Sequence, residues 1–143
     1  MNPADHESQI RAVIAARAEA IRSKDVTGAL RHVGEASVGF FLAPPLQTKG
    51  PLKEELEGWF ATFRGPIGYE LRDVKITASD DLAFSHGFIH ITGTKFDGEL
   101  PDVWFRETLC FQKSDGQWRI AHAHESVPYY MDGSVKAAVD LKP

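Results

Sequence analysis

The sequence has one cysteine, no long apolar run and no basic N-terminal region, and each absence excludes a class of protein. Cys110 cannot form a disulfide within the chain, so the usual reason to assign an oxidising compartment is missing. No run approaches the roughly 18 apolar residues of a membrane span, and the N-terminus MNPADHESQI lacks the pattern of a signal peptide. We therefore expect a cytoplasmic protein that does not associate with a membrane.

A strong charge of one sign is also missing. The formal net charge is -4, from 16 basic and 20 acidic residues that are interspersed rather than grouped. Without a basic stripe, nucleic acid is not an expected partner. The 143 residues, 43% hydrophobic and 25% charged, contain no repeat and no low-complexity segment. They predict one globular domain over residues 1–143.

The first part of the chain has the periodicity of helices. Apolar residues recur with the spacing of one helical face over residues 5–24, at Ile10, Val13, Ile14, Ala20 and Ile21. Arg17 lies on the same stripe, where its guanidinium must either reach water or meet an acid inside. Asp25 can cap a short second helix that ends near Val33. Gly50 and Pro51 open a third helix, whose apolar face consists of Leu52, Leu56, Trp59, Phe60 and Phe63.

The rest of the chain has the periodicity of strands. SVGFFL, at residues 37–42, predicts one strand, and from residue 67 the apolar period is two. Turn residues separate four segments at 67–78, 82–93, 102–113 and 117–127. Three helices followed by an antiparallel meander predict an α+β fold, with helices on one face of a curved sheet.

The last hairpin decides which side chains face the helices. We expect a three-residue turn that places Lys113 opposite Gln117, whereas a two-residue Asp-Gly turn would shift the pairing by one. One face then carries Trp104, Arg106, Thr108, Cys110, Trp118, Ile120, His122, His124 and Ser126. The other face carries Phe105, Glu107, Leu109, Phe111, Arg119, Ala121, Ala123, Glu125 and Val127.

Four histidines can share the first face, because His86 and His90 alternate in one phase of their strand. A metal site needs three ligands within about 2.1 Å of one ion, and same-face residues two apart on a strand diverge. The sequence also has no HExxH motif. We expect no metal, and instead a buried polar layer in which the histidines bond with Arg106, Thr108 and Ser126.

Glu107 and Glu125 stand on the second face among apolar and small residues. If Arg17 points inward from the first helix, it meets them in an apolar pocket where carboxyl pKa values move from their usual range. Glu125 and Glu107 are the candidate catalytic residues. A purely structural ion pair between helix and sheet is an equal alternative.

The chain resembles the SnoaL-like branch of the nuclear transport factor 2-like superfamily over nearly its whole length. The resemblance rests on the order of elements, on Arg106-x-Thr108, and above all on DGQWRIAHAHESVP at residues 115–128. It implies a conical α+β fold, with three N-terminal helices packed on a strongly curved antiparallel sheet around a pocket. It also implies a homodimer formed through the outer sheet face, which would be the histidine face.

The superfamily includes ketosteroid isomerases, polyketide cyclases, dehydratases and members that only bind, so the fold does not fix the chemistry. Ketosteroid isomerases carry a tyrosine where this chain has Arg17, and a base aspartate near the position of Phe41. Both are missing here, so the resemblance does not imply isomerisation of a steroid by that residue set.

Three functions remain open. The first is a cofactor-independent isomerase, cyclase or lyase that uses Glu125 or Glu107 in acid-base chemistry. The second is a binding module for a small apolar or carboxylated molecule. In both, the predicted ligand-binding residues are Arg17, Trp59, Phe63, Leu109 and Ala123. The third is a dimerisation domain.

Overall fold

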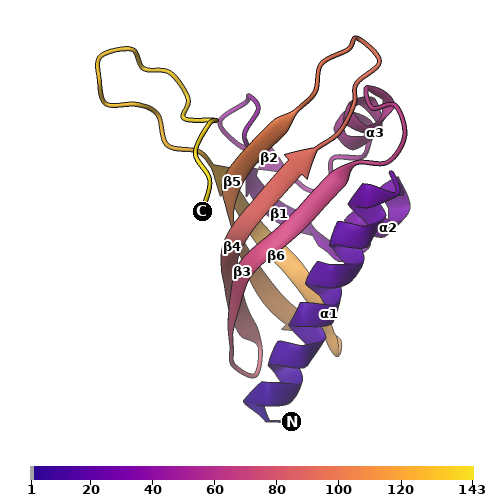
Figure 1. Ribbon diagram of the computed structural model, residues 1–143. Coiled ribbons are helices and arrows are strands. Elements are labelled where there is room, and N and C mark those ends of the chain that lie inside the picture. The colour runs from indigo at the N-terminus through magenta and orange to yellow at the C-terminus, as the bar shows by residue number, and fades with distance from the viewer. Residues whose placement is uncertain (1) are drawn as a thin grey trace.

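The computed structural model describes residues 2–143, in which three helices and six strands form the α+β fold that the sequence predicts (Figure 1). The elements in chain order are α1 (Pro3–Arg22), α2 (Val26–Leu30), β1 (Val33–Phe40), β2 (Thr48–Lys49), α3 (Lys53–Ala61), β3 (Gly68–Ala78), β4 (Leu82–Thr92), β5 (Asp102–Ser114) and β6 (Gln117–Ser126). Within residues 2–143, none of the helices has the length and apolar content that crossing a bilayer requires.

The boundary between α1 and α2 is set by local hydrogen bonds. The backbone N–H of Asp25 donates to the carbonyl of Ala20 at 2.8 Å, just beyond Lys24, which has a positive φ of 58°. The Asp25 carboxylate then accepts from the N–H of Gly28 at 3.0 Å and so caps α2.

Removing this cap gives a first prediction. Asp25→Ala is expected to lower the free energy of unfolding by about 1 kcal/mol, because the Gly28 N–H loses its acceptor. Urea unfolding followed by circular dichroism measures the change. The matched control is Asp81→Ala at an exposed position outside any helix, and an equal loss in both variants would contradict the role of the cap.

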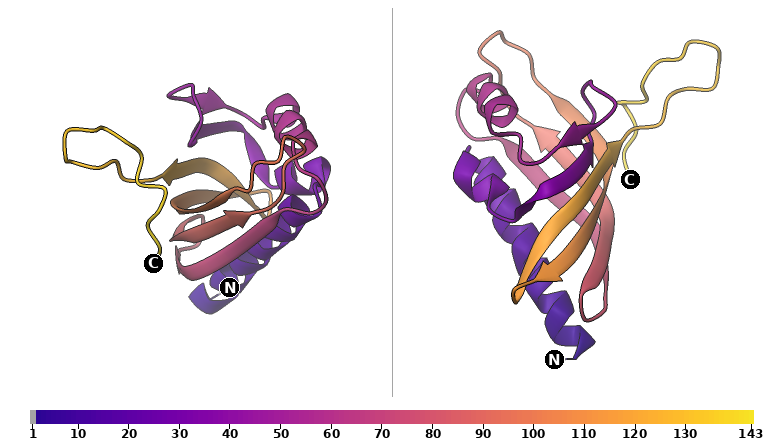
Figure 2. Two further views of the ribbon diagram at one scale, coloured as in Figure 1. Left: turned by 45° about the horizontal axis from the view of Figure 1, so that its top comes forward. Right: turned by 180° about the vertical axis from the view of Figure 1, so that it is seen from behind.

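The six strands form one mixed sheet in the order β2-β1-β6-β5-β4-β3. Strand β1 pairs in parallel with β6, whereas the other neighbouring strands pair antiparallel. The prediction of a strongly curved antiparallel sheet is therefore wrong in both respects, since the sheet is not strongly curled (Figure 2). The sequence predicted a strand at residues 37–42, which overlaps β1 at Val33–Phe40, but the period carries no information about the partner that this strand meets.

The turn between β5 and β6 has two residues, not the expected three. Ser114 pairs with Gln117, and Asp115 and Gly116 both have positive φ, 51° and 75°, as a tight hairpin turn requires. A bulge follows at Ala121, because Phe111 pairs with Ile120 whereas the adjacent Cys110 pairs with His122.

The shorter turn changes the faces of residues 117–120, and the bulge restores the predicted faces from His122 onward. Trp118 and Ile120 are buried with Leu109 and Phe111 on the face toward the helices, so their predicted place on the histidine face is wrong. Arg119 and Ala121 correspondingly leave the inner face. After the bulge the predicted face is confirmed for Ala123 and Glu125, but the predicted register is wrong by two positions, since Glu107 pairs with Glu125 and not with Ala123.

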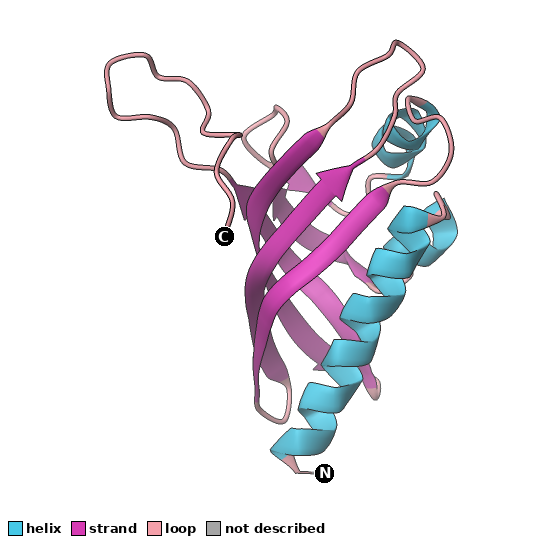
Figure 3. Ribbon diagram, viewed as in Figure 1, coloured by secondary structure: helices cyan, strands magenta, loops and turns pink. Residues whose placement is uncertain are grey.

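Helix α1 runs along the sheet from the end that holds the β3–β4 and β5–β6 turns, here called the hairpin end, to the opposite end, here called the loop end (Figure 3). Two apolar clusters lie between helices and sheet. The hairpin-end cluster consists of Ile10, Ile14, Ala83, Leu109, Phe111, Trp118, Ile120 and Ala123. The loop-end cluster includes Ala18, Ile21, Phe60, Phe63, Ile67, Tyr69, Ile89, Ile91 and Phe105.

Candidate functional site

Arg17 points inward from α1 and meets an acid. Its Nη1 lies 3.3 and 3.4 Å from the two carboxylate oxygens of Glu107 in the middle of β5. The side chains are 14% and 5% exposed, respectively, so the guanidinium does not extend to water. Of the two alternatives that the sequence left open for Arg17, the structure has the internal ion pair.

Glu125 completes a pair of carboxyl groups. It stands directly opposite Glu107 on β6, and side chains at such paired positions are near neighbours. Burial, and then the charge of Glu107 and a hydrogen bond with it, raise the pKa of Glu125 to about 8; the charge of Arg17 and a backbone hydrogen bond from Leu42 act in the opposite direction. At neutral pH Glu125 therefore keeps its proton, whereas Glu107 forms the ion pair with Arg17.

Tyr69 is a member of the site that the sequence analysis missed. It lies on β3, is 5% exposed, and has Arg17, Glu107 and Glu125 as its charged neighbours. Burial, and then the charge of Glu107, raise the pKa of its hydroxyl, against the influence of Arg17, so the phenol keeps its proton. The alternation of Ile67, Tyr69 and Leu71 places all three on the inner face and is the signal that would have found it.

Arg17, Tyr69, Glu107 and Glu125, here called the buried cluster, come from four different elements, α1, β3, β5 and β6. The buried cluster lies where the two apolar clusters meet. Tyr69 belongs to the loop-end cluster. Leu109 and Ala123, which are two residues from Glu107 and Glu125 along their strands, belong to the hairpin-end cluster. Electrostatic interactions are stronger in such surroundings than in water.

The other predicted ligand-binding residues all lie on the inner side. Leu109 and Ala123 are 1% and 4% exposed and pack in the layer next to the glutamates. Phe63 is fully buried, and Trp59 packs edge-on against it. The structure brings Leu109 and Ala123 close to the buried cluster, whereas Trp59 and Phe63 belong to the loop-end packing. Contact of these four residues with a ligand stays a prediction.

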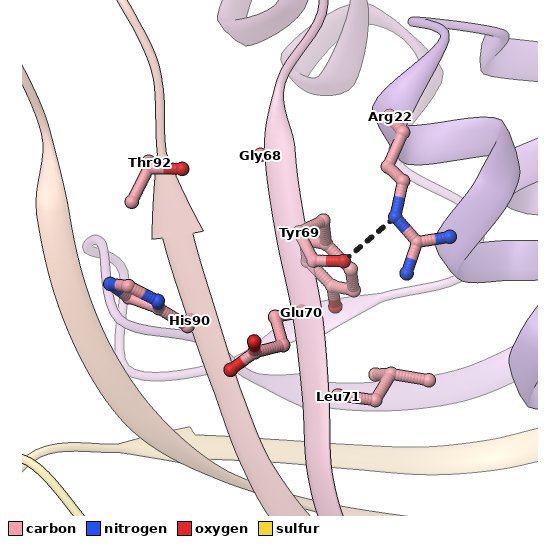
Figure 4. Close-up of a pocket in the computed structure, with 7 residues that line it drawn as sticks. All are labelled: Arg22, Gly68, Tyr69, Glu70, Leu71, His90 and Thr92. Atoms are coloured by element: carbon pink, nitrogen blue, oxygen red, sulfur yellow. Dashed lines mark hydrogen bonds between the residues drawn. The ribbon is translucent and has the colours of Figure 1, made fainter.

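Two cavities border this region. The larger, about 450 Å³, is an open depression at the free edge of β3, beside Arg22, His90 and Thr92 (Figure 4). There Arg22 Nε donates to the carbonyl of Tyr69 at 2.8 Å, and neither Glu107 nor Glu125 lines it. The smaller, about 10 Å³, touches Glu107 from the side of Ile14 and Leu71. It has room for one water molecule at most, so we assign the site from the charged side chains and not from cavity size.

The histidines lie on the outer face, but not as the expected buried polar layer. His86 and His124 are exposed, His122 Nδ1 bonds the carbonyl of Val38 at 2.6 Å, and His90 Nε2 lies 2.6 Å from Asp102 Oδ1. Arg106 bonds Ser126 instead of a histidine. In the part of the chain that the structure describes, no group of three His, Cys, Asp or Glu side chains has the arrangement of a metal site. A homodimer through this face stays a prediction.

Comparison with known proteins identifies relatives of the whole domain. The crystal structure of an NTF2-like protein of unknown function from Pseudomonas putida KT2440 is 30% identical, with a TM-score of 0.87 and 98% of each chain covered. A candidate scytalone dehydratase from Novosphingobium aromaticivorans is 19% identical, with a TM-score of 0.75 over 93% of this chain and 91% of that chain. At this level of identity the similarity is evidence of a shared fold only.

A third match covers a small part of a much larger protein. The dynein-1-alpha heavy chain of the flagellar inner arm I1 complex from Chlamydomonas reinhardtii is 29% identical over 79 residues, which are 55% of this chain and 2% of that protein. The model of the SnoaL-like domain family matches residues 10–130. Because this match spans most of the chain and the NTF2-like protein from Pseudomonas putida is similar over its whole length, the chain belongs to the SnoaL-like domain family, within the NTF2-like superfamily.

Proposed function

We propose that the buried cluster is an acid-base site that removes water from, or moves a double bond in, a small and largely apolar molecule. The observation that supports this proposal is the pairing of Glu125 with Glu107: two carboxyl groups hold one proton, and the pKa of Glu125 is about 8. General acids and bases work best when their pKa lies near the working pH. The similarity in fold to a candidate dehydratase agrees with this class of reaction.

Each of the four side chains has its own role in a dehydration. One carboxyl group takes the proton from the carbon next to a carbonyl, and Glu125 gives its proton to the departing hydroxyl group, so that water leaves. The two carboxyl groups then exchange the proton, which restores the starting state. Tyr69 and Arg17 donate hydrogen bonds toward negative charge that develops on the carbonyl oxygen. The C–O bond breaks as the C=C bond forms and water leaves, with no net oxidation or reduction, so the scheme uses no cofactor.

The pH dependence of stability tests the shared proton. A folded-state pKa of about 8 for Glu125, against the ordinary 4.5, means that the folded protein keeps a proton that the unfolded chain has lost between these values. The free energy of unfolding should therefore fall as the pH rises from about 4.5 to about 8. Glu125→Gln should flatten this slope, whereas Glu35→Gln, at an exposed position on β1, should leave it unchanged. Urea unfolding at a series of pH values measures it, and parallel curves for the wild type and Glu125→Gln would contradict a shared proton.

Turnover is tested with a panel of cyclic β-hydroxy ketones, which absorb in the ultraviolet once they lose water and become conjugated. The wild type should convert at least one of them, and Glu125→Gln should be slower by about 10²-fold or more, the usual contribution of a general acid. Glu35→Gln should keep full activity. The proposal fails if no compound reacts, or if Glu125→Gln reacts as fast as the wild type.

A further inference from the structure

Residues 128–141 form an arm that projects from the loop end of the molecule. The chain leaves the end of β6 and runs out on the side of the sheet away from α1, as the views in Figures 1 and 2 agree. Two backbone hydrogen bonds shape the arm. The N–H of Tyr130 donates to the carbonyl of Lys136 at 2.8 Å. The N–H of Ala138 donates to the carbonyl of Pro128 at 2.7 Å. Neither bond reaches the sheet, so they hold the shape of the arm without fixing it to the rest of the fold.

The arm exposes large apolar side chains. Met131 is 85% exposed and Val135 is 71% exposed, and the half-exposed apolar side chains of the arm are Tyr129, Val139 and Leu141. A short hairpin is marginally stable in water unless its apolar side packs against something. A group of exposed apolar side chains of this size usually marks a contact with another molecule. We therefore expect the arm to dock on a second surface.

The tip of the arm also carries a negative charge. Asp132 follows Met131, and its carboxylate accepts a hydrogen bond from the N–H of Ser134 at 2.9 Å. The hydroxyl and the N–H of Ser134 hold the pKa of Asp132 below its usual range, so this carboxyl group is ionised at neutral pH. A surface that matches the tip must therefore offer apolar side chains next to a positive charge.

The same chain has such a surface at the hairpin end of its outer face. Leu82 and Phe84 are 56% and 45% exposed there, because they alternate along β4 with the buried Ala83. Lys75 and His86 are both exposed and pair with each other across β3 and β4. The ring of His86 stacks on that of Phe84. The outer patch, as it is called here, consists of Lys75, Leu82, Phe84 and His86.

The arm cannot reach the outer patch of its own chain. Phe84 lies eight residues from the loop end of β4 at Thr92, which is roughly 26 Å along the strand. The tip at Gly133 is five residues beyond Pro128, which allows roughly 17 Å even for an extended chain, and the arm points away from the sheet. A contact between the two surfaces therefore needs a second molecule.

From this complementarity we infer that the arm packs on a second copy of the chain. Met131 and Val135 lie against the apolar side chains of the outer patch of that copy, and Asp132 lies beside its Lys75. In a two-fold pair the loop end of each copy faces the hairpin end of the other, so both arms make the same contact. The inference goes beyond the predicted homodimer, because it assigns the contact to the arm. It does not rest on the acid-base chemistry proposed for the buried cluster.

The first test compares the association of full-length variants. Met131→Asp/Val135→Asp should raise the dissociation constant of the dimer by at least about 10-fold, measured by sedimentation equilibrium at pH 7, because both substitutions put charge into an apolar contact. The control Leu46→Asp/Phe96→Asp makes the same change at exposed apolar residues of two other loops and should leave the constant unchanged. Circular dichroism shows that each variant is folded.

A charge reversal tests the contact between the tip and the outer patch. Asp132→Lys should weaken the dimer by at least about 5-fold, because it places like charges together at two contacts in each dimer. Asp132→Lys/Lys75→Asp should recover most of this loss. Both positions are exposed, so the fold tolerates either change. A purely local effect of one substitution would not be reversed by the other.

Four results would overturn the inference. The first is a wild-type chain that stays monomeric at about 100 μM, a concentration at which even a weak dimer forms. The second is a dimer that Met131→Asp/Val135→Asp does not weaken, or that the control weakens equally. The third is a charge-reversed pair no tighter than Asp132→Lys alone. The fourth is a dimer that Phe84→Asp weakens and the arm variants do not, which would assign the contact to the outer face without the arm.

Discussion

Glu107→Ala should lower the free energy of unfolding by about 3–5 kcal/mol, the usual cost of leaving one member of a buried ion pair without its partner. The expectation follows from the exposed fractions of 14% for Arg17 and 5% for Glu107, and from the two contacts of Arg17 Nη1. Alanine also leaves a void beside Leu109, which adds to the loss. Chemical denaturation at pH 7 measures the change, with Glu35→Ala as the control on an exposed strand position.

The double variant Arg17→Met/Glu107→Leu should unfold within about 1 kcal/mol of the wild type or be more stable. Its side chains have similar volumes to the originals, and replacing a buried ion pair by apolar groups is often neutral or stabilising. If the Arg17–Glu107 ion pair serves function and not stability, the double variant should keep its stability and lose its acid-base activity. A double variant as unstable as Glu107→Ala would indicate that the pair holds helix to sheet, the structural alternative of the sequence analysis.

The sequence was a good guide to the elements, because helices and strands have local signals. The 3.6-residue period over α1, the cap at Asp25 and the two-residue period after Ile67 each depend on neighbours in the chain. The pairing of β1 with β6 has no such signal. It joins residues more than 80 positions apart, so a meander extended to β1 predicts an antiparallel sheet where the structure has a mixed one.

The inward position of Glu125 was predicted correctly, although the predicted register was wrong. The expected three-residue turn, with Lys113 opposite Gln117, would place Ala123 opposite Glu107. The two-residue turn and the extra residue at Ala121 each shift the pairing by one position, so Glu125 lies opposite Glu107 and remains on the inner face. The shorter turn placed Trp118 and Ile120 on the opposite face from the predicted one, whereas the bulge depends on the twist and packing of the sheet and is not evident from residue types.

Tyr69 was missed for a different reason. Its inward phase was available from the alternation, but a tyrosine on an inner face is usually a core residue whose hydroxyl finds a single partner. Only the three-dimensional arrangement shows that Arg17, Glu107 and Glu125 all interact electrostatically with its hydroxyl group. Residues that come together at a site from four separate elements show no characteristic spacing in the sequence.

Ile120→Asp should prevent folding or lower the free energy of unfolding by more than about 4 kcal/mol, whereas His124→Asp should change it by about 0.5 kcal/mol or less. With an unbroken alternation the two positions share a face and would respond alike. The bulge at Ala121 puts Ile120, 2% exposed, inside the hairpin-end cluster, and leaves His124 exposed on the outer face. An aspartate at 120 would lie among Phe111, Trp118 and Leu109 without a basic partner, and at 124 it would lie in water. Thermal and urea unfolding of the two variants give the comparison, and a tolerated Ile120→Asp beside a disruptive His124→Asp would reverse the assignment of faces on which the whole site depends.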